Sequence, residues 1–131
     1  MRNGVVMTDA GFEAVLGTVL VLGWVFGHID GQDFADPAGG GVAAAFGLLL
    51  IGLAVGLAEI VKRERVTDAV LVTLAGGNLA FAALFAIWLQ VAEGFTASGR
   101  AVVWATVVML LLLGLAQAFV ARTQPQEPSS R

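Results

Sequence analysis

Polar side chains are scarce in this chain, and a few of them fall within long apolar stretches. Thr18, Thr73, Asn78 and Gln117 could bind a polar ligand there, because a polar group in apolar surroundings needs a hydrogen-bond partner. If consecutive helices are antiparallel, reflecting positions about each loop centre places Thr18 level with Asn78. Thr73 and Gln117 then pair about one helical turn away. These four residues are a predicted polar layer, which either joins helices by hydrogen bonds or lines a path for a polar substrate or ion.

Charged residues gather near the ends of the apolar stretches. Glu59 precedes Lys62 by three residues and Arg63 by four, so the three share one helix face and can form ion pairs. The acidic residues expected at the same level are Asp9, Glu13 and Asp68. A proton relay is one interpretation of this acidic group. We favour the other, a belt of ion pairs at the edge of the apolar region, in which Glu13 takes part.

The remaining constellation is His28 with Asp30 and Asp33. An imidazole and carboxylates can bind a divalent ion, but this spacing matches no ligand motif, so we expect an acidic loop in water with no metal and no cofactor. The chain has one histidine, no cysteine and no nucleophile motif or phosphate-binding loop. An enzyme is therefore not expected.

Four uncharged stretches must position these residues, and they cover 14–29, 37–58, 69–92 and 101–121. About 20 helical residues cross a bilayer core of ~30 Å. Charged residues make up 13% of the chain, against about 25% in soluble domains. The sequence predicts an all-α membrane protein with one four-helix transmembrane domain over 1–122 and a disordered cytoplasmic tail over 123–131. The predicted helices are about 9–29, 38–62, 67–92 and 98–121.

Short loops make neighbouring helices antiparallel, which predicts an up-down-up-down bundle. Basic residues set its orientation: six of the seven lie inside if both termini are cytoplasmic, and only Arg100 lies outside. Trp24, Trp88 and Trp104 then fall near the outer ends of their helices. The N-terminus lacks the pattern of a cleaved signal peptide, and Met7 is an alternative start. The abundance of Arg, Ala and Gly indicates a prokaryote, so we expect a multi-pass prokaryotic cell-membrane protein.

Small residues recur at four-residue spacing in two helices. Gly23 and Gly27 form one such pair, and Gly52 and Gly56 form the other. Small residues let helix backbones approach closely, so these faces are candidate packing or docking surfaces. The expected partners are the lipid bilayer and either other membrane subunits or a second copy. The net charge of −3 gives no reason to expect nucleic acid.

The second half of the chain carries Asn78-Leu79-Ala80-Phe81, Trp88, Thr96, Gly99 and Gln117. This pattern resembles small uncharacterised bacterial four-helix inner-membrane proteins, and the resemblance implies a fold and a location but no activity. Glu13, Gly17 and Thr18 are similar to the first helix of small multidrug-resistance exporters, yet the chain has no tyrosine. Phe81 and Phe85 are similar to the third helix of fluoride channels, yet the Thr-Phe-Ser-Thr-Phe run of that family is missing.

Two functions remain open from the sequence. The favoured hypothesis is a non-catalytic integral membrane protein, an accessory or structural subunit that associates with other membrane proteins or with itself. Its basis is the number of small-residue faces and the scarcity of buried charge. The alternative is a small homo-oligomeric transporter or channel built around Thr18, Asn78 and Glu13.

Overall fold

A computed structural model describes residues 2–26 and 41–123 of the chain, and this part is all-helical apart from short connections. Its helices are α1 (Arg2–Val25), α2 (Gly41–Lys62), α3 (Asp68–Val91) and α4 (Ala97–Thr123). All four are long and apolar enough to cross a membrane. The predicted acidic loop with His28, Asp30 and Asp33 lies outside the described residues, as do residues 124–131 of the predicted tail.

The main difference from the predicted helix bounds is at the start of α1. This helix begins at Arg2 rather than at Asp9, and Asp9 and Glu13 lie inside it on its buried face. Their charges suggested a helix end in contact with water, but the fold accommodates both carboxyl groups in its interior. The described bounds of α2, α3 and α4 differ from the predicted ones by three residues or fewer.

Local capping explains where α3 and α4 begin. The side-chain oxygen of Thr67 accepts a hydrogen bond from the backbone N–H of Val70 at 3.2 Å, which satisfies one free donor of the first turn of α3. Thr96 does the same for Gly99 at the start of α4, at 3.0 Å. Between α3 and α4 the chain turns through Gly94, whose φ of 97° is one that a residue with a side chain rarely adopts.

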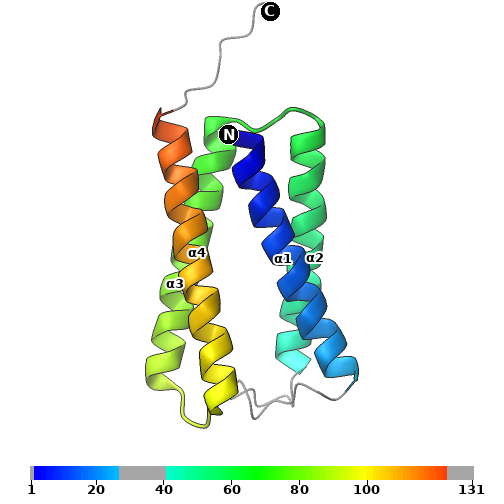
Figure 1. The fold of residues 1–131 in the computed structure, drawn as a ribbon, viewed down its shortest axis with the longest axis vertical. Coiled ribbons are helices and arrows are strands. Elements are labelled where there is room, and N and C mark those ends of the chain that lie inside the picture. Colours follow the sequence, from blue (N-terminus) through cyan, green and yellow to red (C-terminus); the bar gives the residue numbers. More distant parts are fainter. Residues whose placement is uncertain (1, 27–40, 124–131) are drawn as a thin grey trace, which may run out of the picture.

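The helices form two antiparallel hairpins, α1 with α2 and α3 with α4 (Figure 1). Contact within each hairpin is extensive, whereas α1 and α4 touch much less. The hairpins meet at the end of the bundle where α1 begins and α4 ends, which we call the amino-terminal end. They diverge toward the opposite end (Figure 1). The bundle is therefore two tight pairs with a looser seam between them.

Glycine permits the close approach within the first hairpin. A Cβ on Gly17 would lie 2.5 Å from the carbonyl oxygen of Gly47, and a Cβ on Gly47 would lie 2.8 Å from that of Gly17. In the second hairpin a Cβ on Gly114 would lie 2.8 Å from Cγ of Leu79 and 3.2 Å from the carbonyl oxygen of Ala75. Close backbone contact at small residues is the usual way in which helices pack when hydrophobic burial contributes little.

Buried apolar side chains form two clusters along the bundle. Val6, Leu57, Leu71 and Val120 belong to the cluster nearer the amino-terminal end. The cluster nearer the opposite end contains Leu20, Leu50, Leu89, Val103 and Val107. Along α1, α3 and α4 the buried polar residues Asp9, Glu13, Asn78 and Gln117 lie between members of the two clusters. A polar layer therefore interrupts the apolar core.

The glycine contact gives a stability prediction. Gly17→Ala places a methyl group against the Gly47 carbonyl, and such overpacking costs about 1–3 kcal/mol, which exceeds the gain of ~1 kcal/mol in helix propensity. We expect a lower thermal unfolding midpoint for the purified protein in detergent. Gly52→Ala is the matched control, because nothing lies within 4 Å of its Cβ position, so its midpoint should be equal or higher. A Gly17→Ala midpoint at or above that of Gly52→Ala would contradict this packing.

Candidate functional site

One face of α1 carries both acidic residues. Asp9, Glu13, Gly17 and Leu20 are spaced by four, four and three residues, so they share a side of the helix. This side is buried: Asp9 is 0% exposed and Glu13 is 7% exposed. Gly17 holds the same face against α2, so the packing of the first hairpin directs both carboxyl groups into the bundle.

Asp9 is bonded to two amide side chains from the other hairpin. Its Oδ2 accepts from Nδ2 of Asn78 at 3.0 Å and from Nε2 of Gln117 at 2.5 Å. The Nδ2 of Asn78 also donates to Oε1 of Gln117 at 2.9 Å. These three residues, which we call the Asp9 cluster, close a ring of hydrogen bonds among α1, α3 and α4. Since a buried polar group is costly without partners, the ring fixes how the two hairpins meet.

Asp9 and Glu13 each keep a carboxyl oxygen that accepts no hydrogen bond from the described residues. Oδ1 of Asp9 and Oε2 of Glu13 are buried and have no hydrogen-bond partner among the described residues. A buried carboxylate without compensation is strongly disfavoured, and it gains from a proton or a cation. Two carboxyl groups one helical turn apart are therefore equipped to hold a positive charge.

A pocket opens beside the cluster, and we call it the Glu13 pocket. All four helices contribute to its wall, it is open on one side, and the space inside it is small. Its polar lining comes from Glu13, Asn78 and Thr106, and the rest is apolar. The aromatic lining residues are Phe12, Phe46, Phe81 and Phe85. A small, mostly apolar pocket with a few converging polar groups is typical of ligand sites.

The structure brings together two of the four residues of the predicted polar layer. Asn78 and Gln117 bond directly to each other and to Asp9, whereas Thr18 and Thr73 lie on exposed helix faces. The expected depth of a residue in the membrane does not determine which side of its helix the residue lies on. Thr18 is one residue, or about 100°, beyond the buried Gly17, and Thr73 lies midway between the buried Leu71 and Ala75.

Only some of the residues predicted to form ion pairs at the helix ends do so. Glu59 pairs with Arg63 at 3.1 Å and with Lys62 at 3.9 Å on an exposed surface, where such pairs contribute little stability. Glu13 forms no ion pair with them. It lies about 16 Å along α1 from Arg2 at 1.5 Å per residue, within the bundle. At the amino-terminal end Arg2 instead pairs with Asp68 of α3.

Of the two predicted glycine faces, that of Gly52 and Gly56 lies outside the intramolecular contacts. Gly52 and Gly56 face open space, with nothing within 4 Å of a Cβ at either position. Gly23 is half-buried, and Gly27 lies outside the described residues. The glycines that pack the first hairpin are Gly17 of α1 and Gly47 of α2. The sequence prediction used pairs of glycines four residues apart in one helix, so it missed this pair between two helices.

The sequence predicted that Asp9 lies near a helix end, whereas it lies in the interior of the bundle. Phe46, which lines the Glu13 pocket, was not predicted. The four-residue spacing of Asp9, Glu13 and Gly17 was the available signal, because it puts both carboxyl groups on a close-packing face. No group of three or more His, Cys, Asp or Glu side chains in the described part of the chain is arranged to hold a metal ion.

No known protein family matches this chain, and no curated protein or solved structure matches it. The proposals on its function consequently rest on the residues and geometry described above.

Proposed function

We propose that this chain is a small membrane transporter or channel that holds a proton or cation at Asp9 and Glu13. The observation that supports it best is the pair of buried carboxyl groups, each with an oxygen that no described residue bonds. Ionisable groups at membrane depth are costly and are characteristic of ion and substrate pathways. No group in the described part of the chain is placed as a nucleophile beside them, so we propose transport rather than catalysis, by a small homo-oligomer.

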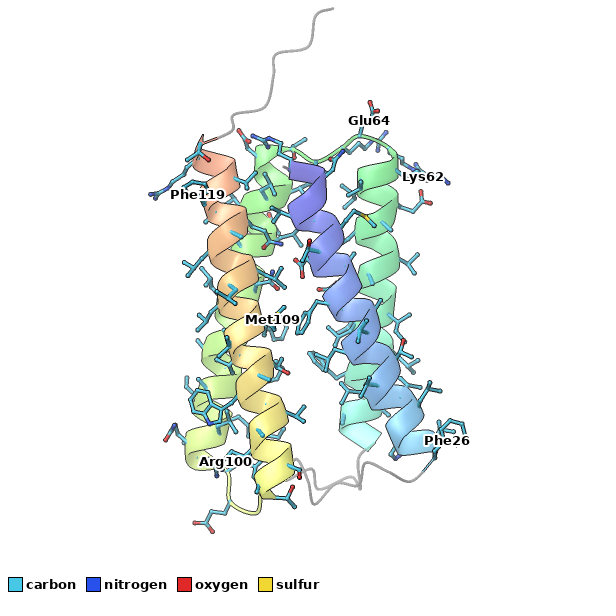
Figure 2. All side chains as sticks on the ribbon, in the orientation of Figure 1. Phe26, Lys62, Glu64, Arg100, Met109 and Phe119 are labelled. Atoms are coloured by element: carbon cyan, nitrogen blue, oxygen red, sulfur yellow. The ribbon has the colours of Figure 1, made fainter. Side chains whose placement is uncertain are left out.

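Location in a bilayer is part of this proposal. Large apolar side chains face outward on the helices, among them Leu48 at 62%, Val72 at 61% and Phe119 at 59% exposure. A patch of this extent is unusual on a soluble monomer and suits lipid. Basic residues favour both termini in the cytoplasm of a prokaryotic cell. In Figure 2, Lys62 and Glu64 mark the proposed cytoplasmic end, and Phe26 and Arg100 mark the opposite end.

The orientation can be tested with single cysteines, because the chain contains none. Glu93→Cys and Glu64→Cys place a thiol in the α3–α4 and α2–α3 connections, where both residues are exposed. A membrane-impermeant maleimide should label Glu93→Cys in intact cells and Glu64→Cys only after permeabilisation. The reverse pattern would invert the topology, and labelling of both in intact cells would contradict a membrane-spanning bundle.

The looser seam between the hairpins supports transport as well. Each hairpin is held by close backbone contact, whereas α1 and α4 contact each other much less. Movement of one packed unit against another around a fixed site is a general route to alternating access. Here the two hairpins are the units, and the Asp9 cluster is the point about which they rearrange.

Flux measurements test the proposal directly. In liposomes loaded with a pH-sensitive dye, the wild-type protein should pass protons or exchange them for a monovalent cation. Asp9→Asn and Glu13→Gln keep the shape of each side chain and remove its charge, so flux should fall to the level of empty liposomes. Glu59→Gln is the control, because Glu59 lies at an exposed helix end, and it should transport normally. Wild-type flux in both site variants would rule out these carboxyl groups as the site.

An accessory membrane subunit is the second candidate function. It is favoured by Gly52 and Gly56, which face open space on the outer side of α2. A helix of another membrane subunit could approach α2 closely at these two positions. On this proposal the chain is non-catalytic and acts by holding its partner in place.

Mass analysis of the protein extracted in mild detergent tests the second candidate. A stoichiometric larger subunit should copurify with the wild type and be lost in Gly52→Leu and Gly56→Leu, because the new side chains block close approach. Thr73→Leu adds comparable bulk to an exposed face of α3 and should retain the subunit. Purification of the wild type without any other subunit would remove the basis for this function.

A further inference from the structure

An ion pair joins the two hairpins at the amino-terminal end of the bundle. Arg2 of α1 donates from its Nη2 to Oδ1 of Asp68, the first residue of α3. We call this contact the Arg2 ion pair. The side chain of Arg2 is 15% exposed and that of Asp68 is 52% exposed, so the pair lies at the boundary between the interior and water. It therefore acts directly on the contact between the hairpins.

Inward from this pair, one face of α1 and one face of α3 carry side chains in the same order. Each has a charged residue at the helix start, then an apolar residue, then a member of the Asp9 cluster. These residues are Arg2, Val6 and Asp9 on α1, and Asp68, Leu71 and Asn78 on α3. Spacings of four and three residues on α1, and of three and seven on α3, put each set on one side of its helix. Since both helices run away from the amino-terminal end (Figure 1), the two sets are parallel and are bonded to each other at both ends.

Apolar side chains separate the Arg2 ion pair from the Asp9 cluster. Val6 and Leu71 are 0% exposed, and Val120 of α4 is 1% exposed. All three belong to one buried cluster, and we call them the apolar plug. They lie between the ion pair and Asp9 along the bundle, so they must move apart before water reaches Asp9 from the amino-terminal end.

The apolar plug does not by itself specify a closed arrangement in a bilayer. Lipid tails are as apolar as these side chains, so burial against another helix adds little driving force. The Arg2 ion pair is directional, because its attraction falls as the two charged groups separate. Water reaches Asp68, and an ion pair in contact with water contributes little stability. The pair can therefore break and re-form at small cost, as a reversible contact requires.

We propose that the Arg2 ion pair is a gate that holds the apolar plug closed and so controls access to the Asp9 cluster. This inference rests on the proposed function, because it assigns the regulation of access to the same acidic site. When the pair breaks, the hairpins separate at the amino-terminal end, which is cytoplasmic in the proposed topology, and water reaches Asp9. When the pair re-forms, this route is closed.

Labelling of single cysteines by N-ethylmaleimide tests the gate in protein reconstituted in lipid nanodiscs. Val6→Cys places a thiol in the apolar plug, and Val103→Cys places one in the buried cluster nearer the opposite end. Adding Asp68→Asn should raise the labelling rate of Val6→Cys by about twofold to fivefold and leave that of Val103→Cys unchanged. Adding Glu59→Gln is the matched control, because Glu59 pairs on an exposed surface at the end of α2, and it should change neither rate.

Exchange of the two charges separates the effect of the pair from that of each residue alone. Arg2→Asp places two carboxylates opposite each other, and Asp68→Arg places two guanidinium groups there. Either change alone should raise the labelling rate of Val6→Cys at least as much as Asp68→Asn does. The double variant with Arg2→Asp and Asp68→Arg restores opposite charges, so its labelling rate should return to within about twofold of the original.

The outcomes distinguish the gate from the function on which it rests. An unchanged rate at Val6→Cys, an equal rise at Val103→Cys, or a double variant that labels as fast as the single ones would each overturn the gate. Any of these results together with Asp9-dependent proton flux in liposomes would leave the transport function standing. The expected labelling pattern in a protein without wild-type flux would overturn the transport function and keep the Arg2 ion pair as a gate to the Asp9 cluster.

Discussion

The burial of Asp9 is the constraint on which the arrangement of this bundle depends. Its side chain is 0% exposed, and its described hydrogen-bond partners are two amides of the opposite hairpin. Because a buried carboxyl group is costly without partners, any rotation of α1 that moved Asp9 away from Asn78 and Gln117 would be penalised. Apolar side chains give no comparable direction, since one hydrophobic contact replaces another at small cost. The Asp9 cluster therefore sets the register between the hairpins, and glycine contacts set the register within the first.

The polar layer divides the apolar core into two parts. Apolar clusters lie on both sides of it, and the cluster near the amino-terminal end adjoins the ion pair of Arg2 with Asp68. The hairpins diverge toward the end opposite the start of α1. One end of the seam is thus closed by apolar packing and an ion pair. The other end offers the Glu13 pocket, so the two ends of the seam are chemically unlike.

Hydropathy was sufficient to predict four long apolar helices, because the length and apolar character of a segment are local properties. The Asp9 cluster was harder to predict from the sequence. Asn78 and Gln117 stand out as polar residues in apolar stretches, but Asp9 resembles a residue at a helix end until its partners on α3 and α4 are known. Thr18 and Thr73 have the same polarity and face outward. The four-residue spacing of Asp9, Glu13 and Gly17 puts them on one face of α1, but only the three-dimensional packing shows which residues of the other helices this face contacts.

Asp9 and Glu13 lie one turn apart, and their surroundings give them different roles. Asp9 accepts two hydrogen bonds through Oδ2 and keeps only Oδ1 unbonded, so most of its acceptor capacity holds the hairpins together. Glu13 makes no hydrogen bond in the described part of the chain, and it lines the pocket. A charge gained at Glu13 acts on Asp9 across one helical turn in surroundings of low polarity, where electrostatic interactions are strong. A proton or cation held at Glu13 would therefore alter the balance of the hydrogen bonds that join the hairpins, which links the charge at Glu13 to their rearrangement in the proposed transport function.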